Sequence, residues 1–367
     1  MNNKSIYFFI GTTAELIKVF PIMQQMYKEN IQYKIIASGQ NRLDQDIMTK
    51  TGINPIDIYL YNKPIKQSAI GVLFWFIKTL IKSLLSLKKE FHKLDKTNSY
   101  MIVHGDTVST VMGAMIGRFY GLKVVHVEAG LRSFNYFKPF PEEIDRMIVS
   151  KLTDIHCCPN KWSMHNIKSN KGIKISTEQN TLLDSLSFAL SLEIKSDLYD
   201  RLADQDFFVF VFHRQENLFD EKLLHSIFKK ITEYSKHTMK CLLILHAPTK
   251  EALMKNNLLS NIEAEETIIT TNRLNYFEFM KILSISKFIV TDGGSNQEES
   301  YYFGKPCLIL RNETERNEGL NENVVLSKLD FDVIDGFLQN YTKYQRDFIQ
   351  VDEKPSSKIV STIMKDS

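Results

Sequence analysis

Acidic residues and a histidine recur in this sequence directly after short apolar segments. Asp106 and Glu128 each follow such a segment, Glu142 stands in "PFPEEIDR" (residues 139–146), and His213 opens "HRQEN". Carboxylates held close together raise each other's pKa, which suits acid and base catalysis. Each residue also has a simpler interpretation: a helix N-cap for Asp106, a favourable charge at a helix start for Glu142, and a buried core histidine for His213. Their coincidence favours a catalytic site.

A second group of residues is suited to binding phosphate. Gly293 and Gly294 lie in "TDGGSNQEES", between an apolar segment and an expected helix. Glycine lets the backbone approach a ligand closely, and a helix N-terminus offers free N–H donors. Arg311 and Arg316 follow in "RNETERNEG", and arginine suits a diphosphate, with a surface loop of mixed charge as the simpler alternative. The sequence has neither GxGxxG nor GxxxxGK[ST], so we predict no nicotinamide cofactor and no NTP hydrolysis.

The composition is that of an ordinary globular protein. The 367 residues, 43% of them hydrophobic, suffice for one large or two ordinary domains with a sizeable core. A net charge of +3 is too small to indicate a nucleic-acid partner. The acidic triplets "DQD" and "DFD" stand at no clear strand end, so we expect no metal site. The N-terminus has no signal-peptide cleavage site, and the four cysteines have no CxxC spacing, which predicts a cytoplasmic chain with reduced thiols.

The elements that must position these residues alternate between strand and helix. This alternation predicts an α/β fold with two Rossmann-like, doubly wound parallel sheets. Ligands of such sheets bind beyond the carboxyl ends of the strands, so the cleft between two such domains is the expected site. Strands are expected at 5–10, 33–37, 99–105, 123–128, 154–159, 207–213, 241–246, 266–270, 287–294 and 306–310, with helices at 14–29, 107–120 and 220–234 among others.

The pattern restarts after a polar region at residues 184–206. We therefore expect an N-terminal domain over residues 1–183 that carries the catalytic carboxylates. A C-terminal, nucleotide-binding domain is expected over 184–345. The last segment, 346–367, is expected to form a helix that returns to the N-terminal domain.

The most apolar stretch of the chain is residues 69–91. Lys78 and Lys82 interrupt it, so it is no membrane-spanning helix. Two interpretations stay open: a helix packed on a sheet or on a dimer partner, and a basic amphipathic surface that touches a membrane. The polar residues of this stretch recur at helical spacing and predict one polar stripe: Lys78, Thr79, Lys82, Ser83, Ser86, Lys89 and Glu90.

Eight short motifs together resemble the UDP-N-acetylglucosamine 2-epimerases. They occur in the order and approximate spacing seen in that family, between residues 11 and 319. The resemblance implies the two-domain glycosyltransferase-B type fold, a UDP-sugar substrate, no cofactor, and commonly a dimer. The motifs are "GTTAELIK", "HGDT", "HVEAGLR", "PEEIDR", "HRQEN", "GGSNQEE", "GKPCLILR" and "TERNEG".

The resemblance also implies a reaction and roles for individual residues. UDP leaves C1 as the C2 proton is lost, and the resulting 2-acetamidoglycal is reprotonated on the other face as UDP adds back. Carboxylates act as acid and base, and cations hold the diphosphate. By resemblance, Asp106, Glu128 and Glu142 carry the acid, base and sugar-positioning roles, and His213 lies near the diphosphate. Substrate binding is implied for Lys18, Arg146, Gly293, Gly294, Ser295, Glu299 and Arg316.

Several motifs depart from the family pattern around the nucleotide. Thr13 replaces an arginine in "GTTAE", Asn317 replaces a proline in "ERNE", and the family's "SGG" is "GGS" here. In the bacterial members of the family that a second UDP-N-acetylglucosamine activates, a longer form of the segment "GQNRLDQ" helps to form the regulatory site. The shorter segment in this sequence disfavours activation of that kind.

Three activities stay open: a non-hydrolysing 2-epimerase for surface polysaccharide, a hydrolysing relative that releases free sugar and UDP, and a glycosyltransferase on the same scaffold, which residues 69–91 would suit at a membrane.

Overall fold

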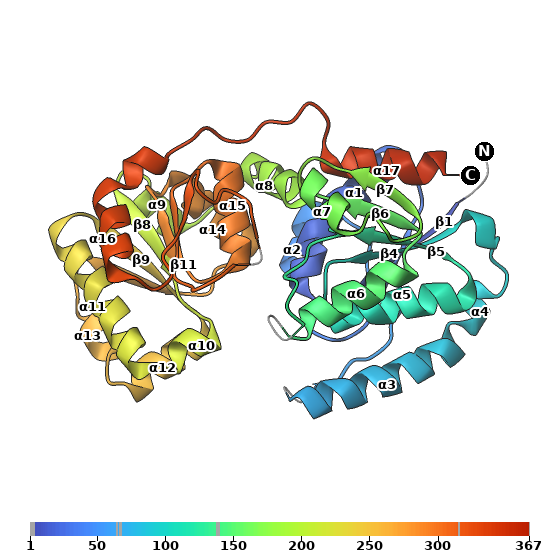
Figure 1. The fold of residues 1–367 in the computed structure, drawn as a ribbon, viewed down its shortest axis with the longest axis horizontal. Coiled ribbons are helices and arrows are strands. Elements are labelled where there is room, and N and C mark those ends of the chain that lie inside the picture. The colour runs from blue at the N-terminus through green and yellow to red at the C-terminus, as the bar shows by residue number, and fades with distance from the viewer. Residues whose placement is uncertain (1–3, 64, 66–67, 137–139, 315, 367) are drawn as a thin grey trace. The chain divides into compact units, whose positions relative to one another are not determined.

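The computed structural model describes residues 4–63, 65, 68–136, 140–314 and 316–366 (Figure 1). The start of "PFPEEIDR" at Pro139 lies outside the described residues. Contacts divide the chain into two compact units. The first unit comprises Met1–Ser185 and Asp352–Ser367, and the second comprises Leu186–Val351.

The first unit is built on a seven-stranded sheet in which every pairing is parallel. The order is β3-β2-β1-β4-β5-β6-β7, so the strand order reverses direction between β1 and β4. This reversal is the place where doubly wound sheets bind ligands. The strands are β1 (Ser5–Ile10), β2 (Lys34–Ala37), β3 (Ile58–Tyr59), β4 (Ser99–His104), β5 (Lys123–Val127), β6 (Ile155–Cys158) and β7 (Ile173–Ser176).

Helices cover both faces of this sheet. In Figure 1, α5 and α6 lie on one face with α3 beyond α5, and α1 and α17 lie on the other. The C-terminal helix α17 packs against α1, and its neighbour Asp366 accepts from the side chains of Lys123 and Tyr100. The helices are α1 (Thr13–Lys28), α2 (Gln45–Thr51), α3 (Ala69–Ser86), α4 (Lys88–Phe91), α5 (Val108–Tyr120), α6 (Glu142–Leu152), α7 (Lys161–Asn166) and α17 (Pro355–Lys365), with α8 (Leu182–Ser191) running into the second unit.

The second unit holds a six-stranded sheet, also parallel throughout, in the order β10-β9-β8-β11-β12-β13. Its core is rich in phenylalanine, because the β8 sequence "FFVFV" is buried on both faces. The strands are β8 (Phe207–Val211), β9 (Lys240–Leu245), β10 (Ile268–Asn272), β11 (Ile289–Thr291), β12 (Cys307–Ile309) and β13 (Val324–Leu326). The helices are α9 (Asp197–Leu202), α10 (Gln215–Leu218), α11 (Glu221–His237), α12 (Ala247–Lys255), α13 (Leu259–Glu263), α14 (Tyr276–Ile285), α15 (Gly294–Phe303) and α16 (Phe331–Asn340).

The predicted fold class is confirmed: each unit is a doubly wound parallel sheet. All ten predicted strands form, although most are shorter than expected because their last residues turn into the loops that carry the polar motifs. The sequence analysis missed three strands, β3, β7 and β13. All three lie at sheet edges, where a strand is paired on one side only and its apolar pattern is weak.

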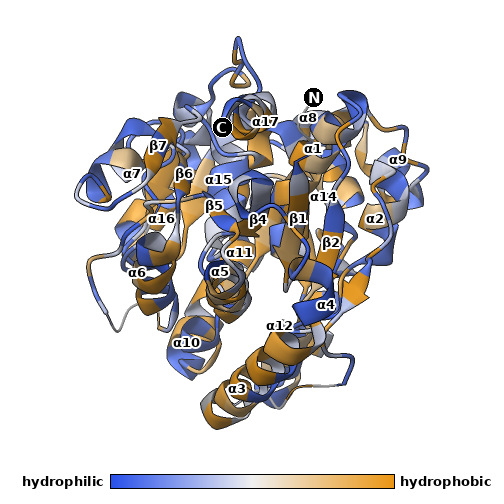
Figure 2. Cartoon of the chain, turned by 90° about the vertical axis from the view of Figure 1, so that its right-hand side faces the viewer, coloured by the Kyte–Doolittle hydropathy of each residue, from blue (hydrophilic) through white to orange (hydrophobic). Residues whose placement is uncertain are grey.

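The prediction for the polar stripe of residues 69–91 is wrong in part. Thr79 and Ser83 are only 1% exposed and face inward beside buried Trp75. Ser83 satisfies its hydroxyl by donating to the carbonyl of Thr79 at 2.6 Å, which lets a small polar residue pack in the core. The outward face is mostly apolar, with Ile70 82% exposed and the helix coloured hydrophobic along most of its length in Figure 2, and it also carries the exposed Lys78 and Lys82.

Candidate functional site

Two adjacent strands of the first unit place Asp106 and Glu128 side by side. His104, the last residue of β4, pairs in register with Val127, the last residue of β5. Asp106 then lies two residues past the end of β4 and Glu128 one residue past the end of β5. Glu128 has a positive φ of 64°, a conformation that a non-glycine residue adopts only where its surroundings hold it. This register brings the residues that follow β4 and β5 to the same edge of the sheet.

The Glu128 carboxylate is the centre of a buried group. Its Oε2 forms an ion pair with Lys18 of α1 and accepts a hydrogen bond from the Asn180 side chain. The His104 Nε2 lies 3.6 Å from the same oxygen, and neither ring nitrogen of His104 has a hydrogen-bond partner among the described residues. A buried carboxylate in contact with an ammonium is held in its charged form. Glu128 can therefore act as a fixed negative charge or as a base.

Asp106 is held by Arg146, which reaches it from the first turns of α6. The Arg146 Nη2 donates to Asp106 Oδ2, and its Nη1 lies 3.5 Å from Oε2 of Glu143. Glu143 also accepts from Arg132 Nε at 2.5 Å and from the Ser133 backbone at 2.9 Å. Burial raises the pKa of Glu143, but these hydrogen bonds and the two arginine charges outweigh burial and lower it. Glu143 is thus an ionised anchor for the two arginines.

Two more carboxylates belong to the first turn of the same helix, α6. Glu142 and Asp145 are three residues apart, so they share one face of the first turn. Asp145 is buried, and its pKa is raised to about 8 by burial and by the charges of Asp106 and Glu142, against the opposing charge of Arg146. We call the following five residues the carboxylate cluster: Asp106, Glu128, Glu142, Glu143 and Asp145.

Two buried groups hold the loops that carry this cluster. Glu15 accepts from the backbone of Gly11 at 2.7 Å and from Thr107 Oγ1 at 2.5 Å, which connects the end of β1 with the end of β4. Burial raises the pKa of Glu15. His126 lies within β5, and burial lowers its pKa to about 3, so its ring is neutral at pH 7. Its Nε2 lies 2.7 Å from the carbonyl oxygen of Gly105, to which it donates in the matching tautomer.

The corresponding edge of the second unit is organised by Asp292, just past the end of β11. Its carboxylate accepts from the backbone of His213 at 3.0 Å, from the backbone of Arg214 at 2.9 Å and from Asn217 Nδ2 at 3.1 Å. The His213 Nδ1 lies 3.2 Å from Oδ1 of the same carboxylate. Burial alone raises the pKa of Asp292, but its contacts with His213 and the backbone donors outweigh burial and lower it. We call these four residues the Asp292 network.

The predicted phosphate-binding turn follows Asp292 directly. Gly293 is the N-cap of α15, and Gly294 is its first residue. A Cβ on Gly293 would lie 3.1 Å from His213 Cε1 and 2.7 Å from Asn296 Oδ1, so a larger residue here would require the Asn296 side chain to move. Ser295 is exposed in the first turn, where the backbone N–H groups lack intrahelical acceptors. This helix end can therefore receive an anion next to the His213 ring.

The remaining predicted residues of the second unit lie along α15 and the loop beside it. Glu299 is buried, and its Oε2 accepts from Asn296 Nδ2 at 2.9 Å. Arg316 Nη1 donates to the buried Glu298 at 2.6 Å, so the arginine is fixed in place by α15. The His246 ring stacks on His213 with centroids 4.8 Å apart, and burial with the nearby His213 charge lowers the pKa of His246 to about 4.

The structure thus brings the predicted residues together in two sets. In the first unit these are Lys18, Asp106, Glu128, Glu142 and Arg146, and in the second His213, Gly293, Gly294, Ser295, Glu299 and Arg316. Sequence reasoning assigned no role to His104, Asn180 or Asp292, which contact these residues. His104 and Asp292 did carry a signal, since each is a polar residue at a strand end beside a motif. The partners of Asn180 are too far away in sequence for a local pattern to reveal.

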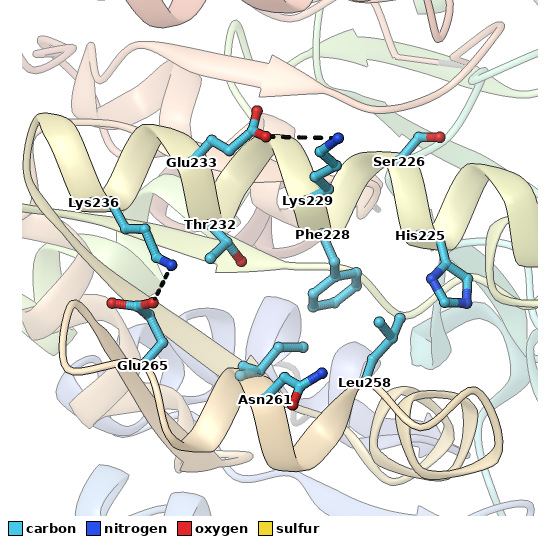
Figure 3. Close-up of a pocket in the computed structure, with 11 residues that line it drawn as sticks. His225, Ser226, Phe228, Lys229, Thr232, Glu233, Lys236, Leu258, Asn261 and Glu265 are labelled. Carbon is cyan, nitrogen blue, oxygen red and sulfur yellow. Dashed lines mark ion pairs between the residues drawn. The ribbon is translucent and has the colours of Figure 1, made fainter.

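A groove of about 460 Å³ lies elsewhere on the second unit, between α11 and α13 (Figure 3). Its lining includes the apolar side chains of Phe228, Leu258 and Ile262. The ion pairs Lys229–Glu233, at 3.9 Å, and Lys236–Glu265, at 2.8 Å, stand at its rim. None of the predicted site residues lines this groove.

Residues 4–63, 65, 68–136, 140–314 and 316–366 contain no group of three or more His, Cys, Asp or Glu residues placed to hold a metal ion. Within the same ranges, no helix is both long and apolar enough to cross a membrane.

Comparison with known families gives one match that covers most of the chain. The sequence model described as UDP-N-acetylglucosamine 2-epimerase matches residues 24–360. A curated UDP-N-acetylglucosamine 2-epimerase of Campylobacter jejuni is 30% identical over 345 residues, covering 88% of this chain and 85% of the relative. A curated UDP-2,3-diacetamido-2,3-dideoxy-D-glucuronate 2-epimerase of Pseudomonas aeruginosa is 32% identical over 315 residues and covers 83% of both chains.

Solved structures give a similar result. The crystal structure of UDP-GlcNAc 2-epimerase from Neisseria meningitidis bound to UDP-GlcNAc has a TM-score of 0.78 and 25% identity. The match covers 98% of this chain and 100% of that one. The likeness therefore extends over both units.

Proposed function

This chain belongs to the UDP-N-acetylglucosamine 2-epimerase family, and we propose that it inverts C2 of UDP-N-acetylglucosamine without hydrolysing it. In the proposed reaction, a carboxylate removes the C2 proton as the C1–O bond to UDP breaks, and UDP departs with the bonding electrons. The 2-acetamidoglycal is then protonated on the opposite face of C2, and UDP adds back to C1. Sugar and UDP are recombined, so the reaction needs no water.

The observation that carries this proposal is the carboxylate cluster of the first unit. The C2 proton is not activated by a carbonyl group, so its removal needs a strong, well-placed base and a second group on the opposite face. Asp106 and Glu128 stand at neighbouring strand ends, each fixed by a cation, and Glu142 begins the adjoining helix. We assign the acid, base and sugar-positioning roles to these three carboxylates, with Lys18 holding Glu128 and Arg146 holding Asp106.

We assign nucleotide binding to the second unit. The departing diphosphate would meet the N-terminus of α15 at Gly293, Gly294 and Ser295, with the His213 ring beside it. Glu299, on the same helix, would accept hydrogen bonds from the ribose hydroxyl groups. Arg316, oriented by Glu298, would add a positive charge for the diphosphate.

The test is proton NMR of the purified protein with UDP-N-acetylglucosamine in D2O. We expect deuterium at C2 together with UDP-N-acetylmannosamine signals, because reprotonation draws on solvent. Free sugar plus UDP would instead establish the hydrolysing reaction. The 32% identity to a 2,3-diacetamido-glucuronate epimerase makes that UDP-sugar the second substrate to test. If neither UDP-sugar exchanges its C2 proton, the epimerase proposal is contradicted. Transfer of the sugar to a lipid-linked acceptor would then be tested.

We further propose that the product is made in the cytoplasm and supplies surface polysaccharide. Four free, buried cysteines accord with a reducing compartment. A UDP-activated acetamido sugar is the donor form that polysaccharide synthesis requires, whereas a free sugar would first need reactivation. The non-hydrolysing reaction suits this purpose because it retains UDP on the product.

The exposed apolar face of α3 supports a proposed homodimer. Six large apolar side chains point outward at helical spacing, and the neighbouring α5 exposes two more, Met115 and Phe119. Exposed apolar surface of this breadth typically marks a contact surface. A two-fold dimer would pack this face against its own copy. The six α3 residues are Ile70, Leu73, Phe74, Ile77, Ile81 and Leu85.

Light scattering of the wild type and of the double variant Ile77→Glu/Ile81→Glu tests this proposal. We expect a dimer for the wild type and a monomer for the variant, because both residues are exposed within one subunit and the charges would be buried in the interface. A monomeric wild type would contradict the dimer. If that monomer also co-sediments with anionic vesicles, the α3 face with Lys78 and Lys82 contacts a membrane instead.

A further inference from the structure

Asp145 is the member of the carboxylate cluster to which no role has been assigned. It lies in the first turn of α6 and is only 7% exposed. Its Oδ2 is buried and has no hydrogen-bond partner among the described residues. An ionised carboxylate in that position would lack the donors that normally stabilise a buried charge. The geometry therefore favours a carboxyl group that carries a proton.

The charges around Asp145 lead to the same conclusion. Asp106, after β4, and Glu142, in the same first turn of α6, both act on Asp145 with negative charge, and Arg146 acts on it with positive charge. Arg146 already binds Asp106 through Nη2 and lies 3.5 Å from Glu143 through Nη1. The Arg146 cation that acts on Asp145 is therefore shared with two other carboxylates. Burial and the two negative neighbours raise the pKa of Asp145 to about 8.

We propose that Asp145 is a positioning residue: its protonated carboxyl group reserves Arg146 for Asp106 and keeps a third negative charge away from the reacting carboxylates. This inference rests on the roles proposed above for Asp106 and Glu142. Loss of the Asp145 proton would create a competitor for the Arg146 guanidinium. It would also place a new negative charge beside Glu142. That charge would raise the pKa of Glu142 and make it less suited to the acid–base role proposed for it. Asp145 itself exchanges no proton with the substrate.

The pH dependence of turnover tests this role, because a merely structural aspartate would not change it. We expect wild-type turnover to fall above pH 8 as Asp145 ionises. Asp145→Asn has nearly the same shape and no proton to lose, so it is expected to turn over at pH 7 and to keep that rate at least one pH unit further into the alkaline range. Glu178→Gln serves as the control, since Glu178 lies in the same unit with an exposed side chain.

Two results would overturn the proposal. If turnover of Asp145→Asn and of the wild type falls over the same alkaline pH range, ionisation of Asp145 does not govern the site. If folded Asp145→Asn has no detectable turnover at pH 7, then Asp145 exchanges a proton itself and is no positioning residue.

A second measurement does not depend on turnover. With aspartate labelled by ¹³C at the carboxyl carbon, the wild type is expected to show one resonance that titrates with a midpoint near pH 8. That resonance should be missing from Asp145→Asn and present in Glu178→Gln. Its absence from the wild type would contradict the protonated Asp145 even in an active enzyme. Its presence in a protein without epimerase activity would leave the protonation established and the proposed reaction refuted.

Discussion

The carboxylate cluster of the first unit and the Asp292 network of the second unit stabilise their carboxylates in different ways. In the first unit, carboxylates are balanced by side-chain cations, as in Lys18–Glu128 and Arg146–Asp106. In the second unit, one carboxylate, Asp292, is satisfied mainly by backbone and amide donors. A carboxylate paired with one side-chain cation keeps lone pairs that can take up a substrate proton. A carboxylate saturated by backbone donors holds a loop in place.

This difference is the basis for the proposed division, with chemistry in the first unit and nucleotide anchoring in the second. Substitutions in the carboxylate cluster should then reduce turnover and spare nucleotide binding. Substitutions in the Asp292 network should affect stability or nucleotide affinity first.

The largest effect is expected for Glu142→Gln. Glutamine keeps the size of the side chain and cannot accept or release the proton, so turnover should fall by roughly 10³-fold, within the range that general acid–base groups contribute. UDP affinity, measured by titration calorimetry, should change little, and the unfolding midpoint should stay near that of the wild type. Glu178→Gln provides the matched control in the same unit, on an exposed side chain. An active Glu142→Gln variant would remove Glu142 from the chemistry.

An intermediate effect is expected for Asp292→Asn. An asparagine offers one acceptor oxygen and places an NH2 group against backbone N–H donors, so the free energy of unfolding should fall by about 2–3 kcal/mol at pH 7. Because the folded-state pKa of Asp292 is lowered, the wild-type advantage is present above the unfolded-state pKa of about 4 and is lost as pH falls through the folded-state value. Urea unfolding of both proteins at pH 7 and pH 3.5 measures this. An equal difference at the two pH values would show that the Asp292 charge is not the source.

The smallest effect is expected for Gly293→Ala. The added Cβ must displace Asn296 Oδ1 and crowd His213, so UDP affinity should fall about tenfold, which corresponds to about 1.4 kcal/mol. Turnover at saturating substrate should fall less, because the carboxylate cluster is in the other unit. Gly336→Ala in α16 is the control, since a Cβ there meets no atom within 4 Å. A Gly293→Ala variant that binds UDP as tightly as the control would contradict the anchoring role of this turn.

The sequence by itself determined the local features of this protein. The apolar segments became strands because their backbones bury best in a parallel sheet, and the residues after them stand at carboxyl ends wherever the sheet forms. The positions of Asp106, Glu128 and His213 just after strand ends could therefore be predicted from the chain. The helix start at Glu142 follows from the proline before it and the acidic first turn.

Only the tertiary structure decided which of these residues contact one another. Lys18 lies 110 residues before Glu128, and Asp292 lies 79 residues after His213, so no local pattern could reveal these pairs. Packing also decided which side of α3 faces outward, because burial of Trp75 turned Thr79 inward. Strand and helix follow from neighbours along the chain, whereas strand register and helix rotation are set by close packing between distant segments. Protonation of Asp145 belongs to this second kind, since it arises from burial and from charges that the fold brings together.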